Sequence, residues 1–93
     1  MAGLKQINQQ LWLDAVPLSD VAQRYSTPCY VYSQSVIEKN FAEYQNALSD
    51  QRHLICFAVK ANSNIAILQT LARLGAGFDI VSIGELERVL IAG

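Results

Sequence analysis

The stretch Leu54-Ile-Cys-Phe-Ala-Val-Lys60 decides the fold, because six apolar residues run without interruption into a lysine. The run is short for a helix and rich in strand-forming residues, so it predicts a strand. A strand without a polar face is typical of a parallel sheet that helices cover on both sides. The segment therefore predicts an α/β fold.

The residues before this strand predict further strands and helices. Leu11–Pro17 is predicted as a short strand or an extended arm, and Ser19–Tyr25 as a cap residue followed by a short helix. Cys29–Tyr32 is β-branched and aromatic and follows a proline, which favours a strand. Ser35-Val-Ile-Glu38 has the form of a capping box, so a helix is expected from there to the polar residues Ser49–Arg52.

The residues after it predict two more helices with a strand between them. Asn62-Ser-Asn64 offers side-chain caps to an apolar helix over residues 65–74, and Gly75-Ala-Gly77 is typical of a helix end. That glycine pair lacks the third glycine of a dinucleotide-binding loop. Phe78–Ser82 is predicted as a strand, and Ser82-Ile-Gly-Glu85 as a second capping box that opens the last helix.

The predicted order from Cys29 onward is β-α-β-α-β-α with short connections. Right-handed crossovers place such strands side by side and parallel, with the helices outside. Three strands form an arc of a (β/α)8 TIM barrel, so the 93 residues are expected to be the truncated opening part of one. The open strand edges of the arc predict self-association if the chain folds by itself.

Charge and composition exclude several classes of function. Seven Lys and Arg against eight Asp and Glu give a net charge of −1, so neither nucleic acid nor an anionic membrane is expected as a partner. The chain has neither an apolar run of about 20 residues nor the features of a signal peptide. Cys29, Cys56 and His53 lack metal-ligand spacing, so no metal site is expected. Both cysteines are expected to be buried as small apolar side chains, and a reducing cytoplasm suits them.

Lys60 is the residue that most suggests chemistry. Period-two alternation puts it on the strand face of Cys56 and Ala58, at the carboxyl end where barrel enzymes carry their reactive groups. Desolvation there would favour the neutral amine, which attacks an aldehyde to form a Schiff base. The pattern alone nevertheless favours the alternative of a lysine whose stem packs while its ammonium reaches water.

Two acidic residues follow the next predicted strand. Asp79 would lie beside Lys60 if the strands are neighbours, where it could accept a hydrogen bond from the amine or balance its charge. Its alternative role is to cap local backbone donors. Glu85 is explained first by the capping box with Ser82.

Two linked motifs resemble one known family. They are Phe57-Ala-Val-Lys-Ala-Asn-Ser-Asn64 and Gly75-Ala-Gly-Phe-Asp-Ile-Val-Ser-Ile-Gly-Glu-Leu86, and both are similar to the start of the diaminopimelate decarboxylase family. Val16–Ser33 is also similar to that family, so the resemblance runs from about Leu11 to Gly93. Ile83 departs from it, because many relatives have glycine there. The pair of motifs is more specific than either alone. With both present, a Lys60 that forms a Schiff base is favoured over a Lys60 whose ammonium merely reaches water.

The resemblance implies a cofactor, a reaction and four site residues. The family's enzymes use pyridoxal phosphate, and Lys60 would hold it through a Schiff base. Ala58 would pack near the cofactor ring, Asp79 would lie close to the lysine, and Glu85 would border the cofactor. The implied reaction removes the carboxylate of meso-diaminopimelate to give L-lysine and carbon dioxide, in a cytoplasmic homodimer.

The resemblance also implies a division of the chain. Residues 1–27 would be an N-terminal arm and short helix, and residues 28–93 the first part of a barrel that binds pyridoxal phosphate. The rest of the barrel and a C-terminal β-domain would be absent, together with the phosphate loop and the residues that face the substrate. The 93 residues alone are therefore predicted not to catalyse decarboxylation.

Two alternatives stay open at this point. One is another pyridoxal-phosphate enzyme of the same barrel class, such as an arginine, ornithine or carboxynorspermidine decarboxylase or an amino-acid racemase. The residues that read the substrate in that class lie beyond Gly93. The other is a pyridoxal-phosphate-binding protein without catalysis, or an interaction module.

Overall fold

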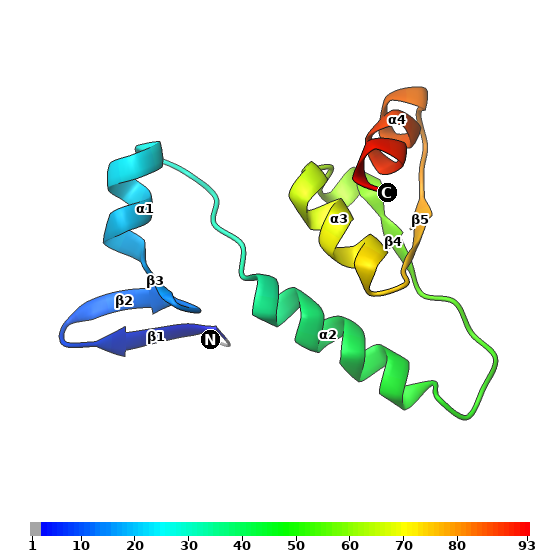
Figure 1. The fold of residues 1–93 in the computed structure, drawn as a ribbon, viewed down its shortest axis with the longest axis horizontal. Coiled ribbons are helices and arrows are strands. Elements are labelled where there is room, and N and C mark those ends of the chain that lie inside the picture. The colour runs from blue at the N-terminus through cyan, green and yellow to red at the C-terminus, as the bar shows by residue number, and fades with distance from the viewer. Residues whose placement is uncertain (1–2) are drawn as a thin grey trace. The chain divides into compact units, whose positions relative to one another are not determined.

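A computed structural model describes residues 3–93 and divides the chain into two compact units, one ending at Val36 and one comprising Ile37–Gly93. The boundary falls in the first turn of a helix, α2 (Gln34–Ala47) (Figure 1). Within residues 3–93, no helix combines the length and apolar character that crossing a membrane requires.

The first unit is a small antiparallel sheet followed by one helix. Its strands are β1 (Leu4–Ile7), β2 (Gln10–Leu13) and β3 (Val16–Pro17), in that spatial order. Asn8 and Gln9 join β1 to β2 with positive φ angles of 51° and 65°, as a two-residue hairpin turn requires. The helix α1 (Leu18–Tyr25) follows β3 directly and contacts β2.

This unit corrects three predictions about the N-terminal residues. The predicted strand or arm over Leu11–Pro17 is two strands, because the chain turns back at Asp14, whose φ is 55°. The short helix is confirmed, but Pro17 and not Ser19 occupies its N-cap position. Cys29–Tyr32 is not a strand, since it pairs with no neighbouring strand among the described residues. Tyr30 is accordingly 91% exposed.

Asp14 joins the turn after β2 to the start of α2. Its carboxylate accepts hydrogen bonds from the hydroxyls of Ser33, at 2.7 Å and 2.9 Å, and of Ser35, at 2.6 Å. The Ser33 hydroxyl in turn accepts a hydrogen bond from the Val36 amide at 3.2 Å, which makes Ser33 a cap of α2. The predicted capping residue, Ser35, instead lies inside the helix and donates to Asp14.

The second unit alternates strands and helices after α2. These elements are β4 (Cys56–Ala58), the single 3₁₀ turn η1 (Val59–Ala61), α3 (Ile65–Arg73), β5 (Gly77–Asp79) and α4 (Ile83–Ala92). β4 and β5 are parallel, with Phe57 opposite Phe78 and Ala58 opposite Asp79. The predicted parallel βαβα order is thus confirmed for this part, although both strands are shorter than the apolar pattern suggested.

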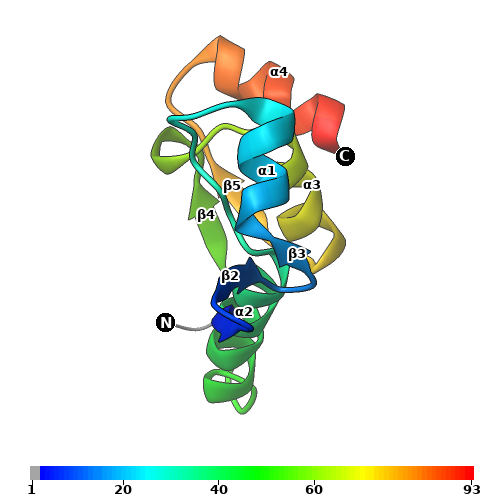
Figure 2. The same cartoon turned by 90° about the vertical axis from the view of Figure 1, so that its left-hand side faces the viewer.

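One face of the strand pair is covered by helices (Figures 1 and 2). Val59, Leu68 of α3 and Ala92 of α4 form one buried cluster, and Phe41 of α2 packs with α3 in another. Phe57 and Phe78 contact both clusters. The core of this unit therefore lies between the strands and the helices.

The opposite face of β4 carries no covering element in the described chain. Leu54 is 70% exposed and Cys56 is exposed, in contrast to the predicted strand with both faces buried. Cys29 is also exposed, so the prediction of two buried cysteines is wrong. Alternation explains Cys56, because Ile55, Phe57 and Val59 take the core side of the segment.

Local capping explains where α3 begins and ends. The Asn64 side chain accepts a hydrogen bond from the Ala66 amide at 2.9 Å, as predicted for this loop. At the other end Gly75 has a φ of +93°, and the amide of Ala76 donates to the Leu71 carbonyl at 3.1 Å. Together with the bond from the Gly75 amide to the Ala72 carbonyl, this is a Schellman motif.

Replacing Asp14 by asparagine should loosen the start of α2. The pKa of the Asp14 carboxyl lies below its ordinary 3.8, chiefly because the Ser35 hydroxyl and then the Ser33 hydroxyl donate to it. A lowered pKa stabilises the folded state above pH 3.8, and this stabilisation is lost as the pH falls through the lowered value. We expect less hydrogen-exchange protection of the Ser35 and Val36 amides in Asp14→Asn at neutral pH. Equal protection in both proteins would contradict the role of the carboxylate.

Gly77→Ala should disturb the strand pair, because a Cβ there would lie 2.8 Å from Cys56 Sγ. Cys56 is exposed, so its thiol can turn away at a smaller cost than the about 1–3 kcal/mol of overpacking in a closed core. We expect faster hydrogen exchange of the residue-77 amide, which donates to the Ile55 carbonyl at 2.9 Å, and recovery when Cys56→Ala is added. Gly84→Ala is the control, since its Cβ would meet nothing nearer than 3.9 Å. Failure of Cys56→Ala to restore protection would rule out the steric cause.

Candidate functional site

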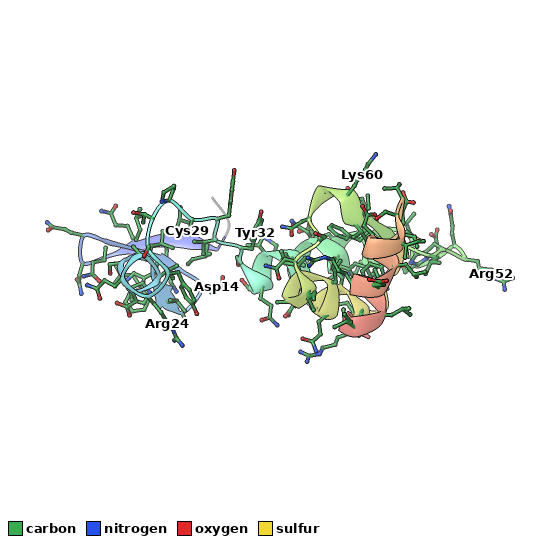
Figure 3. All side chains as sticks on the ribbon, turned by 90° about the horizontal axis from the view of Figure 1, so that it is seen from above. Asp14, Arg24, Cys29, Tyr32, Arg52 and Lys60 are labelled. Atoms are coloured by element: carbon green, nitrogen blue, oxygen red, sulfur yellow. The ribbon has the colours of Figure 1, made fainter. Side chains whose placement is uncertain are left out.

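Lys60 lies directly beyond the carboxyl end of β4. The strand ends at Ala58, and the 3₁₀ turn η1 carries Lys60 between Val59 and Ala61. Val59 is 0% exposed, whereas Lys60 is exposed and its side chain extends away from the ribbon (Figure 3). The turn is thus anchored through one buried side chain and presents the amine of its neighbour.

Asp79 ends the adjacent strand. Because β4 and β5 are parallel and Ala58 is paired with Asp79, the carboxyl ends of both strands meet at one edge. The structure therefore brings Ala58, Asp79 and the Lys60 turn together, as the sequence predicted from the strand ends. Among residues 3–93 no ion pair joins Lys60 to Asp79, and both side chains are exposed.

Glu85 reaches the same edge through the loop after β5. The Ser82 hydroxyl accepts a hydrogen bond from the Glu85 amide at 3.1 Å, and Glu85 Oε1 accepts one from the Val81 amide at 3.0 Å. The predicted capping box is confirmed, with its reverse bond made to the residue before the cap. Glu85 thereby fixes the backbone that leads from Asp79 into α4.

Local hydrogen bonds and one bond from α4 hold the loop after Lys60. The Asn62 amide donates to the Val59 carbonyl at 3.1 Å, and the Asn62 side chain accepts from the Asn64 amide at 3.0 Å. Arg88 of α4 donates from Nη1 to the Ser63 carbonyl at 3.2 Å. Both ends of this loop are therefore attached, one to η1 and one to helices.

The exposure of Lys60 differs from the desolvated amine that the apolar run suggested. The strand face that continues toward Lys60 is open, because Leu54 and Cys56 on that face are exposed too. Desolvation of the amine is not provided by the residues that the structure describes. The exposed amine at the edge of the parallel sheet is accessible to a carbonyl compound, which bonds covalently to the neutral form of a lysine.

Comparison with known families explains this arrangement. Residues 34–93 match the family described as pyridoxal-dependent decarboxylase, pyridoxal binding domain. The chain belongs to this family. The match covers α2 and every element that builds the edge around Lys60, and it confirms the resemblance found in the sequence.

Named relatives of this decarboxylase family agree in sequence and in structure. The diaminopimelate decarboxylase of Vibrio cholerae is 58% identical over 88 residues, which are 95% of this chain and 21% of that protein. A crystal structure from Aquifex aeolicus has a TM-score of 0.89 at 44% identity, covering 98% of this chain and 22% of that one. The diaminopimelate decarboxylase of M. jannaschii, solved with L-lysine, also has a TM-score of 0.89, at 30% identity, over 98% and 22% of the two chains.

The chain spans about a fifth of the length of these relatives. Agreement at this level over nearly the whole chain confirms the predicted fold class, the opening βα units of an α/β barrel. Pyridoxal phosphate is the cofactor of the family. The structure fits this cofactor, because an aldehyde needs an accessible amine and Lys60 presents one at the strand edge.

The sequence did not reveal two residues near this edge. The role of Arg88 was not predicted because its partner is the backbone carbonyl of Ser63. Every residue has such a carbonyl, so the side chain at position 63 gives no sign of the bond. The available signal was its spacing from Glu85, since residues three apart share one face of a helix. Val59 was counted as one apolar residue among six, without a sign that it would be the buried anchor of the Lys60 turn.

Removing the cap of α4 should loosen the loop beside Asp79. Ser82→Ala eliminates the acceptor of the Glu85 amide, and losing an N-cap of this type costs about 1 kcal/mol. We expect faster hydrogen exchange at the Glu85 amide in the full-length protein. Ser82→Thr keeps a hydroxyl acceptor and should retain the protection of the Glu85 amide. Equal exchange of this amide in Ser82→Ala and Ser82→Thr would show that the cap is dispensable.

Proposed function

We propose that this chain forms part of a pyridoxal-phosphate-dependent diaminopimelate decarboxylase that converts meso-diaminopimelate to L-lysine and carbon dioxide. The observation that carries the proposal is the accessible amine of Lys60 at the carboxyl edge of β4 and β5, in a chain of the pyridoxal-binding family. Two kinds of comparison support the substrate. The V. cholerae relative is named diaminopimelate decarboxylase, and the M. jannaschii relative was solved with L-lysine.

Lys60 would hold the cofactor through its Nζ atom. When bound, pyridoxal phosphate accepts the electron pair that is released as the bond to the leaving carboxylate breaks. The Lys60 amine would be displaced by the substrate amine and would in turn displace the product amine, so it must stay within reach of the cofactor throughout the cycle. The anchored η1 turn supports this requirement, because Val59 fixes its backbone while the amine remains free.

Ala58, Asp79 and Glu85 are the other residues proposed to surround the cofactor. Ala58 has only a methyl side chain and leaves room beside Lys60 at the end of β4. The Asp79 carboxylate, on the paired residue of β5, balances the positive charge of a protonated amine at this edge. Glu85 borders the site while its Oε1 holds the Val81 amide.

Three further features belong to this proposal. The working enzyme is a cytoplasmic homodimer, and these 93 residues alone do not decarboxylate. Residues 1–27 serve as an arm and short helix and residues 28–93 as the first part of the barrel, and the rest of the barrel and a separate C-terminal β-domain lie outside these residues. The short span of relatives that the chain covers supports the need for additional residues.

Lys60→Ala tests the proposal in the full-length protein. We expect loss of the visible absorption of bound pyridoxal phosphate and a fall in decarboxylation of at least about a hundredfold. Lys39→Ala is the matched control, because the Lys39 ammonium lies on α2, 4.0 Å from Glu43, and its side chain is 67% exposed. Retention of both absorption and activity in Lys60→Ala would refute the assignment. Absorption without decarboxylation in the unaltered protein would indicate a binding protein or another enzyme of the class.

A further inference from the structure

Arg88 connects two parts of the strand edge that are distant in sequence. Its Nη1 atom donates to the Ser63 carbonyl at 3.2 Å, across 25 positions of the chain. Arg88 lies on α4, and Ser63 lies in the loop that leads from the Lys60 turn into α3. The bond thus ties the loop after β4 to the helix after β5.

The remaining bonds of that loop are local. The Asn62 amide binds the Val59 carbonyl, the Asn64 amide binds the Asn62 side chain, and the Ala66 amide binds the Asn64 side chain. These bonds fix the shape of the loop and its junctions with η1 and α3. The pairing of Ala58 with Asp79 and the burial of Val59 against Ala92 set the start of the turn relative to β5. Arg88 ties the following loop to α4.

One face of α4 serves both loops of the edge. Glu85 and Arg88 are three residues apart, a spacing that places side chains on the same side of a helix. Glu85 holds the Val81 amide after β5, and Arg88 holds the Ser63 carbonyl after η1. A shift of α4 would therefore move both loops together, which preserves the separation between Asp79 and the Lys60 turn.

We propose that Arg88 is a positioning residue that holds the loop after the Lys60 turn against α4 and so steadies the turn beside the end of β5 for cofactor binding. The inference rests on the proposed function, since it assigns Arg88 a role toward the lysine that holds the cofactor. Arginine suits this task because its guanidinium remains charged at all working pH values and offers several donors. A charged donor also makes a stronger hydrogen bond to a carbonyl than a neutral one does.

The test compares Arg88→Met, Arg88→Lys and Arg52→Met in the full-length protein. Methionine keeps most of the apolar stem and removes the donors, while lysine restores a charged donor. Arg52 is the matched control, because it is exposed and extends from a loop (Figure 3). Cofactor-free protein is titrated with pyridoxal phosphate, and the visible absorption is followed together with kcat and KM.

We expect Arg88→Met to bind pyridoxal phosphate about fivefold more weakly, as loss of one such bond allows. Its kcat should fall while the KM for the amino acid stays near that of Arg52→Met, and Arg88→Lys should recover part of both losses. Cofactor affinity and kcat equal to those of Arg52→Met would overturn the proposal. A loss that Arg88→Lys does not relieve would also overturn it.

The Lys60→Ala variant separates this proposal from the proposed function. If Lys60→Ala loses the cofactor absorption while Arg88→Met matches Arg52→Met, only the role of Arg88 is refuted. If Lys60→Ala keeps both absorption and activity, the lysine is not the anchor and the role of Arg88 fails with it.

Discussion

The packing of Val59 against Leu68 and Ala92 is the interaction on which the second unit depends. Val59 and Leu68 are 0% exposed, and they join the end of β4 to α3 and α4. Full burial of such side chains stabilises a fold by about 1.5–3 kcal/mol each. Since Val59 immediately precedes Lys60, the same burial that closes the core also fixes where the amine emerges.

The strand pair and its helices act as one support for the candidate site. Phe57 and Phe78 lie opposite each other and contact both buried clusters, so the two strands share their packing with three helices. The carboxyl edge above them is built from exposed polar residues on capped loops. The packed apolar base thus gives the polar edge a rigid support.

Prediction from the sequence succeeded where the signal was local. The caps at Asn64 and Ser82 and the helix end at Gly75 follow from residue types whose geometry leaves few choices. The parallel pairing of β4 and β5, and hence the approach of Asp79 to the Lys60 turn, followed from the apolar run and the crossover between the strands.

Prediction failed where residue type and environment disagreed. The β1–β2 hairpin turns at Asn8 and Gln9 without the glycine that usually marks such a turn, so β1 escaped notice. Cys29–Tyr32 has the composition of a strand, but a strand needs a neighbour whose backbone completes the ladder, and composition does not show one. Cys56 was expected to be buried because the continuous apolar run predicted a strand covered on both faces, whereas only one face of β4 is covered by the described residues.

The alternation along β4 also limits how this segment can change in length. Val59 is buried and Lys60 beside it is exposed, so a one-residue shift would exchange the two and draw the amine into the core. Insertion or deletion of a single residue within Leu54–Val59 is thus far more damaging than a substitution that preserves volume. The segment thus constrains the number of its residues more tightly than their identity.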